Sequence, residues 1–314
     1  MSAPVELSTG RKLSPVFGFR DAVLRARPSG TPSDQWAAED YSERARRRVA
    51  GAQRRSREIA GAANGARLQR GLEIGCGGGL DCVLAVLDGM EQVVGIDADS
   101  PLLATDRRGP ALRLIGAAAA ITGRHADGEM LLNRLAVQIR PMDACALDFP
   151  DQSFDVVWSR VALEHVQPLD LVLAETARVL RPEGIAHHVI DPLFWLKGCH
   201  ARGLTELPWA HARLGLEDYE RFVRVAESRR RAARRTAWLR SLNALSVDGW
   251  RALFESDPAF DVLAWHEHHS PLAAELLDRY PEVLDDTLPG VTPRDLTCSA
   301  ITVVLRRTGE SPRR

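Results

Sequence analysis

The chain has 314 residues and a mass of 34.6 kDa, which suits one large domain or one domain with a sizeable insertion. Its 41 basic and 42 acidic residues give a formal net charge of −1, whereas proteins that neutralise many phosphates usually carry a basic excess, so no nucleic-acid partner is expected. No apolar run reaches the roughly 18 residues that span a bilayer, and the N-terminal residues lack the apolar core of a secretory signal, so we expect a cytoplasmic protein without a membrane partner.

The N-terminal residues are expected to form a flexible segment followed by a helix. The first part is rich in Pro, Ser and Gly, and Ser33 can then cap a helix whose acidic residues come early and whose arginines come late. Gly61 or Gly65 can end this helix. We therefore assign residues 1–62 to a flexible segment and cap helix, and residues 63–314 to the main domain.

Apolar strands and helices alternate in the next part of the chain. Strands are expected at residues 67–74, 92–96, 154–159 and 185–190, with a short one ending at 141–143, and helices at 80–87, over most of 101–140 and at 169–180. Strands separated by helical stretches predict an α/β fold, in which a doubly wound, mostly parallel sheet carries helices on both faces.

The pattern changes after Asp191. Residues 192–245 contain three tryptophans and the arginine run 229–235, and we expect them to form a mostly helical insertion after the fifth strand. The arginine run is either a solvated helix face or a contact for an anionic substrate. A helix at 247–256 and two further strands, at 260–266 and 296–306, complete seven strands.

The sharpest motif is the glycine turn Glu73-Ile74-Gly75-Cys76-Gly77-Gly78-Gly79. Alternate glycines let the backbone turn tightly and let a ligand approach main-chain amides. Neither the dinucleotide pattern G-x-G-x-x-G nor a P-loop fits this turn. Asp97, after the second strand, can accept both hydroxyls of a ribose, and Asp143, after the third, can accept from an adenine amino group.

The order and spacing of Glu73, Asp97 and Asp143 resemble those of class I S-adenosylmethionine-dependent methyltransferases. LDFPDQSFDVVWSRVALEHV and RVLRPEG are similar to the type 11 small-molecule and glycan subgroup, so the resemblance covers about residues 67–191. It implies a seven-stranded Rossmann-like sheet and S-adenosylmethionine as cofactor. It also implies that Glu73, Gly75, Cys76 and Gly77 line the methionine part, Asp97 and Ala98 the ribose, and Asp143 and Ala144 the adenine, while the Ser159 carbonyl faces the ammonium.

Methyl transfer to oxygen needs a base, because a neutral hydroxyl is a weak nucleophile. His165 or His188 can serve as that base, with Asp191 as the group that orients it. Alternatively, His165 is a helix residue that only packs against the cofactor, and His188 is a strand residue whose hydrogen bonds are made by its neighbours. A carboxylate with histidines can also hold Mg²⁺, which would acidify a sugar diol.

Four further residues are candidates for contact with the substrate: Arg160, His187, Trp209 and His211. Trp209 and His211 can stack on a ring and bind a hydroxyl, although core packing of Trp209 is an equal alternative. After the fourth strand the chain lacks the Asn/Asp-Pro-Pro-Tyr/Phe motif that DNA and amine methyltransferases often show.

These patterns lead to one hypothesis and two rivals. The hypothesis is an S-adenosylmethionine-dependent transferase that O-methylates a hydroxyl of a saccharide or another small-molecule metabolite in biosynthesis. The rivals are an N- or C-methyltransferase of the same fold and a non-catalytic module that only binds the cofactor. The oligomeric state stays open, with a homo-oligomer as one outcome.

Overall fold

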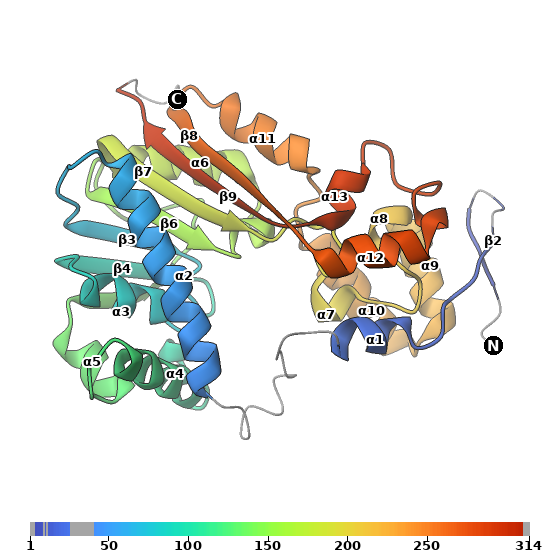
Figure 1. Ribbon diagram of the computed structural model, residues 1–314, viewed down its shortest axis with the longest axis horizontal. Coiled ribbons are helices and arrows are strands. Elements are labelled where there is room, and N and C mark those ends of the chain that lie inside the picture. The colour runs from blue at the N-terminus through green and yellow to red at the C-terminus, as the bar shows by residue number, and fades with distance from the viewer. Residues whose placement is uncertain (1–3, 9, 11, 26–40, 310–314) are drawn as a thin grey trace. The chain divides into compact units, whose positions relative to one another are not determined.

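The computed structural model describes residues 4–8, 10, 12–25 and 41–309, which form two compact units (Figure 1). The helical unit comprises Met1–Gly30, Ile190–Leu253 and His266–Ile301, and the sheet unit comprises Thr31–Val189, Phe254–Trp265 and Thr302–Arg314. Each unit has a hydrophobic core of its own. The insertion expected at 192–245 lies within the helical unit.

A seven-stranded sheet is the central feature of the sheet unit. Its strands follow the order β5-β4-β3-β6-β7-β9-β8, and β3 pairs in parallel with both β4 and β6, as β5 does with β4 and β7 with β6. The predicted mostly parallel, Rossmann-like sheet of seven strands is thereby confirmed. The strands are β3 (Arg70–Ile74), β4 (Gln92–Asp97), β5 (Val137–Pro141), β6 (Phe154–Arg160), β7 (Leu180–Ile190), β8 (Phe260–His269) and β9 (Cys298–Arg307).

Helices cover both faces of this sheet. The β3-α3-β4 and β6-α6-β7 connections run in opposite directions across the sheet, so their right-handed crossovers put α3 and α6 on opposite faces. Figure 1 shows α2 crossing in front of the strands, where Val49 packs with Leu84 of α3 and Ile115 of α4. The helices are α2 (Tyr41–Ala62), α3 (Leu80–Leu87), α4 (Arg108–Ile121), α5 (Gly128–Arg134) and α6 (Leu169–Val179), with 3-10 helices η2 (Pro101–Leu103) and η3 (Leu163–His165). The expected cap at Ser33 lies outside the described residues.

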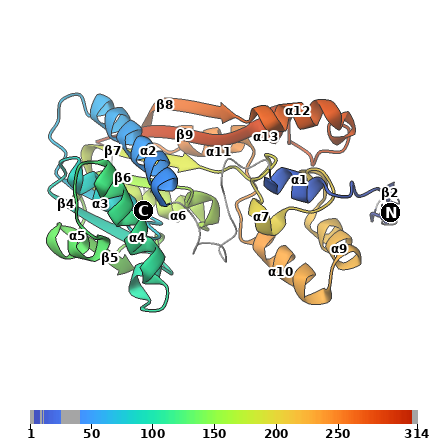
Figure 2. The same ribbon diagram turned by 60° about the horizontal axis from the view of Figure 1, so that its bottom comes forward.

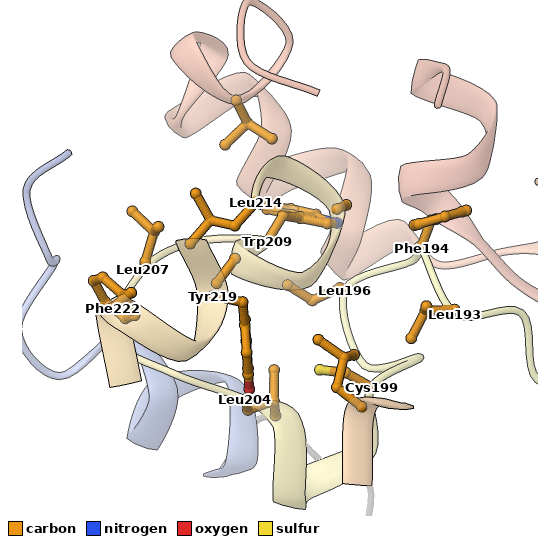
Figure 3. Packing of buried hydrophobic residues seen from close by; sticks show 14 of the residues in the cluster. Leu193, Phe194, Leu196, Cys199, Leu204, Leu207, Trp209, Leu214, Tyr219 and Phe222 are labelled. Carbon is orange, nitrogen blue, oxygen red and sulfur yellow. The ribbon is translucent and has the colours of Figure 1, made fainter. Parts of the chain in front are cut away.

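The helical unit is built around large buried side chains (Figure 3). On α9, Tyr219, Phe222 and Val223 recur at the spacing that puts them on one helix face, and all three are buried. Its elements are β1 (Val5–Glu6), β2 (Lys12–Leu13), α1 (Phe19–Arg25), α7 (His200–Gly203), α8 (Ala210–Arg213), α9 (Leu216–Ala226), α10 (Arg229–Arg240), the start of α11 (Val247–Glu255), α12 (Pro271–Arg279), η4 (Pro281–Val283) and α13 (Pro293–Thr297). No helix in the described part of the chain has both the length and the apolar character needed to cross a membrane.

Strand β7 starts earlier than the sequence indicates. We expected residues 181–184 to separate helix α6 from a strand at 185, but α6 ends at Val179 and β7 begins at Leu180. Leu180 is fully buried and pairs with Phe154, and its carbonyl accepts from the Arg307 guanidinium. These contacts come from distant parts of the chain, so the local Arg-Pro-Glu-Gly pattern gave no sign of them.

Two helices of the helical unit were not expected. Ser270 caps α12, because its Oγ accepts from the Ala273 amide at 3.3 Å. A capping box of Thr292 and Asp295 holds α13 in helical form, so β9 begins at Cys298 and not at residue 296.

Candidate active site

The chain turns sharply between β3 and α3 through the glycine turn. Gly75, Gly77 and Gly79 have φ angles of +69°, +49° and +67°, which side-chain-bearing residues rarely adopt. A Cβ on Gly75 would lie 2.4 Å from Cβ of Ala162, whereas a Cβ on Gly77 would meet nothing within 4 Å. The alternate glycines are therefore required by the backbone, and Gly77 leaves open space beside the main chain.

Asp97, at the end of β4, holds this turn in place. The Gly77 amide donates to its Oδ2 and the Asp99 amide to its Oδ1, both at 2.8 Å. The Cys76 amide donates to the Ile96 carbonyl at 2.9 Å. A carboxylate oxygen accepts more than one hydrogen bond, so each oxygen of Asp97 keeps capacity for a hydroxyl of a ligand.

A cavity of about 670 Å³ opens at the carboxyl ends of β3, β4, β5 and β6. Ligands of open α/β sheets bind at this edge. Two carboxylates and one imidazole line it, and none of the described lining residues is an arginine or a lysine, which favours a ligand with hydroxyl groups and positive charge. The lining residues are Ile74, Gly75, Ile96, Asp97, Ala98, Pro141, Met142, Asp143, Ala144, Val161, Ala162, His165, Val166 and Gln167.

Five of the nine residues predicted to contact the cofactor line this cavity. Gly75 belongs to β3's turn, Asp97 and Ala98 follow β4, and Asp143 and Ala144 follow β5. The Asp143 side chain is exposed, and its Oδ1 accepts from the amide two residues further on at 2.9 Å. A carboxylate accepts several hydrogen bonds, so Asp143 keeps capacity for an amino group of a ligand.

Glu73 does not line the cavity and lies in the core beneath the turn. It is 2% exposed, and its Oε2 accepts from the Cys82 thiol at 2.9 Å. Burial, together with the negative charge of Asp81, raises the pKa of Glu73 to about 7. Cys76 and Gly77 also lie outside the lining, as does Ser159, whose hydroxyl is buried.

Arg160 takes part in a buried charge cluster around Asp81 of α3. Oδ2 of Asp81 lies 2.8 Å from Nη2 of Arg48, 3.3 Å from Nε of Arg160 and 3.6 Å from Nη1 of Arg55. Burial alone would raise the pKa of Asp81, but the three guanidiniums outweigh it and lower the pKa to about 2. The side chain predicted to contact the substrate is therefore engaged by a carboxylate outside the cavity lining.

The three candidate histidines of the sheet unit have different surroundings. His165, on η3, is exposed and lines the cavity. His187 is buried on β7, with Nε2 2.7 Å from Oε2 of Glu58, and burial lowers its pKa. His188 is also buried, with Nδ1 2.9 Å from Oγ of Ser159, and burial lowers its pKa to about 3. Of these three side chains, the structure brings His165 to the cavity.

Asp191, Trp209 and His211 belong to the helical unit. Asp191 accepts from Nε1 of Trp195, and burial raises its pKa to about 7. Trp209 is 1% exposed and donates to the Leu296 carbonyl at 3.1 Å, which matches the core packing that the sequence left open. The buried His211 places Nε2 2.9 Å from the Trp195 carbonyl, and burial lowers its pKa to about 4.

Sequence reasoning missed several residues that line the cavity, among them Met142, Val161, Ala162 and Gln167. Val161 has a φ of +54°, an unfavourable conformation for a β-branched residue, and its amide donates to the Val189 carbonyl at 2.7 Å. Position after a strand end was the available signal for these residues. Nothing in a valine itself indicates a left-handed backbone.

Parts of the chain are similar to known proteins. Residues 72–187 match the family of methyltransferase domains. A ubiquinone biosynthesis O-methyltransferase of Bartonella tribocorum is 28% identical over 156 residues, which cover 50% of this chain and 55% of that protein. A 27-O-demethylrifamycin SV methyltransferase of Amycolatopsis mediterranei is 50% identical over 42 residues, or 13% of this chain and 15% of that protein. The match therefore spans about half or less of these curated relatives.

A solved S-adenosylmethionine-dependent methyltransferase from Mesorhizobium loti is also similar, with 20% identity and a TM-score of 0.43 over 76% of this chain and 90% of that one. A sarcosine dimethylglycine methyltransferase structure from Galdieria sulphuraria has 15% identity and a TM-score of 0.45 over 83% of this chain and 85% of that one.

Proposed function

The chain carries a class I S-adenosylmethionine-dependent methyltransferase domain, and on this premise we propose that it methylates a hydroxyl oxygen of a small molecule. The observation that carries this proposal is the imidazole of His165 on the same cavity as Asp97 and Asp143. Oxygen as the acceptor is supported by the names of both curated relatives, one an O-methyltransferase and one a methyltransferase of a 27-O-demethyl compound. A saccharide or another hydroxylated metabolite is the acceptor class that we favour.

The residues of the cavity fit S-adenosylmethionine, which when bound supplies a methyl group activated by a sulfonium. Asp97 would accept the ribose hydroxyls, and Asp143 would accept from the adenine amino group. The open space beside Gly77 admits a ligand next to the main chain. A cavity with two carboxylates and no lining arginine or lysine among the described residues also suits the positive charge of a sulfonium.

His165 is the residue that we assign to proton transfer. A neutral imidazole nitrogen accepts the hydroxyl proton as the oxygen attacks the methyl group. General-base catalysis of this kind raises the reaction rate by roughly 10²–10⁴-fold. His188 suits this role less well, because its pKa is lowered to about 3 by burial and its Nδ1 lies 2.9 Å from the Ser159 hydroxyl. We assign no proton transfer to Asp191, whose carboxylate accepts from Trp195.

The cofactor site can be tested with Asp97→Ala and the neighbouring Asp99→Ala as its control. Each charged hydrogen bond to a ribose hydroxyl contributes about 1.5–3 kcal/mol, so calorimetry with S-adenosylhomocysteine should show at least tenfold weaker binding for Asp97→Ala. Asp99 is exposed, pairs with Arg107 and does not line the cavity, so Asp99→Ala should bind within twofold of the wild type. Equal affinity of the two variants would count against the assignment.

The base can be tested with His165→Gln and a histidine outside the cavity. With labelled cofactor and a panel of phenols, sugars and amines, His165→Gln should keep its affinity for S-adenosylhomocysteine and lose about 10²-fold or more in kcat. His125→Gln, an exposed histidine absent from the lining, should retain full turnover. Unchanged kcat in His165→Gln would favour the N- or C-methyltransferase.

The labelled products separate the remaining alternatives. A label recovered on oxygen supports the proposal, and a label recovered on nitrogen or carbon contradicts it. No transfer to any acceptor in the panel or in a cell extract would favour a non-catalytic module. Loss of activity in chelator, restored by Mg²⁺, would identify a metal-assisted reaction.

A further inference from the structure

The helical unit holds a second cavity, of about 940 Å³, that the proposed methyl transfer does not use. It lies among α1, α7, α9 and α10, and Figure 2 shows α9 and α10 side by side. Five arginines and two glutamates line it, so its formal net charge is +3. We call it the arginine pocket; its arginines are Arg20, Arg202, Arg231, Arg234 and Arg235.

Two of these arginines build the wall of the pocket. Nε of Arg235 lies 2.7 Å from Oε1 of Glu227, and its Nη1 donates to the Leu204 carbonyl at 2.7 Å. The guanidinium of Arg202 stacks over the Trp238 ring, 4.5 Å from its centroid. The positions of both side chains are thus fixed by contacts within the protein.

Arg231 and Arg234 are different, because neither has an ion pair or a side-chain hydrogen bond with any described residue. Both are exposed and lie three residues apart on α10, so their charges repel along one helix face. The first turn of α10 contains no acidic residue, which makes its positive charges unfavourable for the helix dipole as well. An anion in the pocket would offset both effects.

Other residues of the lining indicate which chemical groups a ligand of the pocket would contain. Ala226 and Ala237 are exposed and give the pocket an apolar side, behind which Phe222 and Val223 are fully buried. Nε of Arg20 is a buried donor without a hydrogen-bond partner among the described residues, so this guanidinium is incompletely satisfied. Guanidinium forks match carboxylate, sulfonate and phosphate oxygens.

We propose that the arginine pocket binds a small organic anion. Its acidic group contacts Arg231 and Arg234, and its apolar body lies against Ala226 and Ala237. The arginine pocket contains none of the residues assigned to the cofactor, so this proposal does not depend on whether the chain methylates oxygen.

The test uses the full chain and 8-anilinonaphthalene-1-sulfonate, an aromatic anion whose fluorescence rises in apolar surroundings. The wild type should bind it saturably, with affinity that falls as salt rises. The double variant Arg231→Glu/Arg234→Glu should bind it at least tenfold more weakly. Its affinity for the uncharged N-phenyl-1-naphthylamine should stay within twofold, because the apolar side is unchanged.

The control is Arg229→Glu/Arg230→Glu, which makes the same change in charge on the same helix. Both arginines are exposed and neither lines the pocket, so this pair should bind the anionic probe within threefold of the wild type. Equal weakening in both pairs would show a general surface effect and overturn the proposal, as would equal loss of the uncharged probe. The milder Arg231→Gln/Arg234→Gln keeps the test decisive if the glutamates unfold the helix, and wild-type affinity in that variant would also overturn the proposal.

Discussion

The two units of the chain hold cavities of opposite charge. In the sheet unit, Asp97 and Asp143 line the cavity, while three arginines are held away from its lining by buried Asp81. In the helical unit the carboxylate of Glu227 is engaged by Arg235, and four further arginines line the pocket with this pair. A formal net charge of −1 gives no sign of this separation, because it sums all charged residues of the chain. Charge is therefore informative about ligands only when it is summed over the residues of one site.

The largest expected effect concerns the charge cluster around Asp81, which keeps three arginines away from the cavity of the sheet unit. Asp81→Asn would leave the buried Arg55 and the partly exposed Arg48 and Arg160 without their shared carboxylate, which costs up to about 3–5 kcal/mol of stability. Chemical denaturation with hydrogen exchange on peptides of the sheet unit would measure the loss. A matched change at an exposed pair, Asp99→Asn, should leave the free energy of unfolding nearly unchanged, because water screens this pair. A loss in Asp81→Asn no larger than that in Asp99→Asn would show that the cluster does not stabilise the unit.

The acid sensitivity of the same cluster gives a second measure. Because the three guanidiniums outweigh burial, the folded protein holds the pKa of Asp81 at about 2, below the ordinary value of 3.8. The stability that this carboxylate contributes is present above about pH 4 and is lost as the pH falls towards 2. Asp81→Asn should therefore flatten the dependence of sheet-unit stability on pH in that window, and an unchanged slope would contradict the assignment.

Asp191 provides the opposite pH dependence in the helical unit. Burial raises its pKa from 3.8 to about 7, so the folded state binds its proton more tightly than the unfolded chain does. Its contribution to stability is complete below about pH 4 and is lost as the pH rises through about 7. Asp191→Asn keeps an acceptor for Trp195, and should reduce the drop in helical-unit stability between pH 5 and pH 8 by on the order of 2 kcal/mol. Hydrogen exchange of peptides from 190–253 would detect this, and an identical drop in wild type and variant would refute it.

The smallest effect is expected at a helix cap. The Thr292 hydroxyl donates to Asp295 at 2.6 Å within the capping box of α13, so Thr292→Ala should cost about 1 kcal/mol in the helical unit. Thr292→Ser keeps the hydroxyl and should restore most of this stability. A thermal melt of the three proteins tests the prediction, which fails if Ser and Ala behave alike.

The sequence predicts much of the sheet unit because its signals are local. Alternating strands and helices gave the parallel sheet, and the alternate glycines gave the turn between β3 and α3, where Gly75, Gly77 and Gly79 all have positive φ. Asp97 and Asp143 stand directly after strands, so parallel strand order alone brings them to one cavity.

Other features depend on contacts that are distant in sequence. His188 lies on a strand with no local sign that the Ser159 hydroxyl and full burial would take it from the cavity. The Asp81 cluster joins residues of α2, α3 and β6, which no motif connects. The arginine run was visible in the sequence, but the pocket that it lines depends on how α9 and α10 pack.

The most direct measurement is a crystal structure of the protein with S-adenosylhomocysteine. We predict density at the carboxyl ends of β3 to β5, with both ribose hydroxyls on the Asp97 carboxylate and the adenine amino group on Asp143. An empty cavity at saturating ligand, or ribose bound away from Asp97, would contradict this prediction.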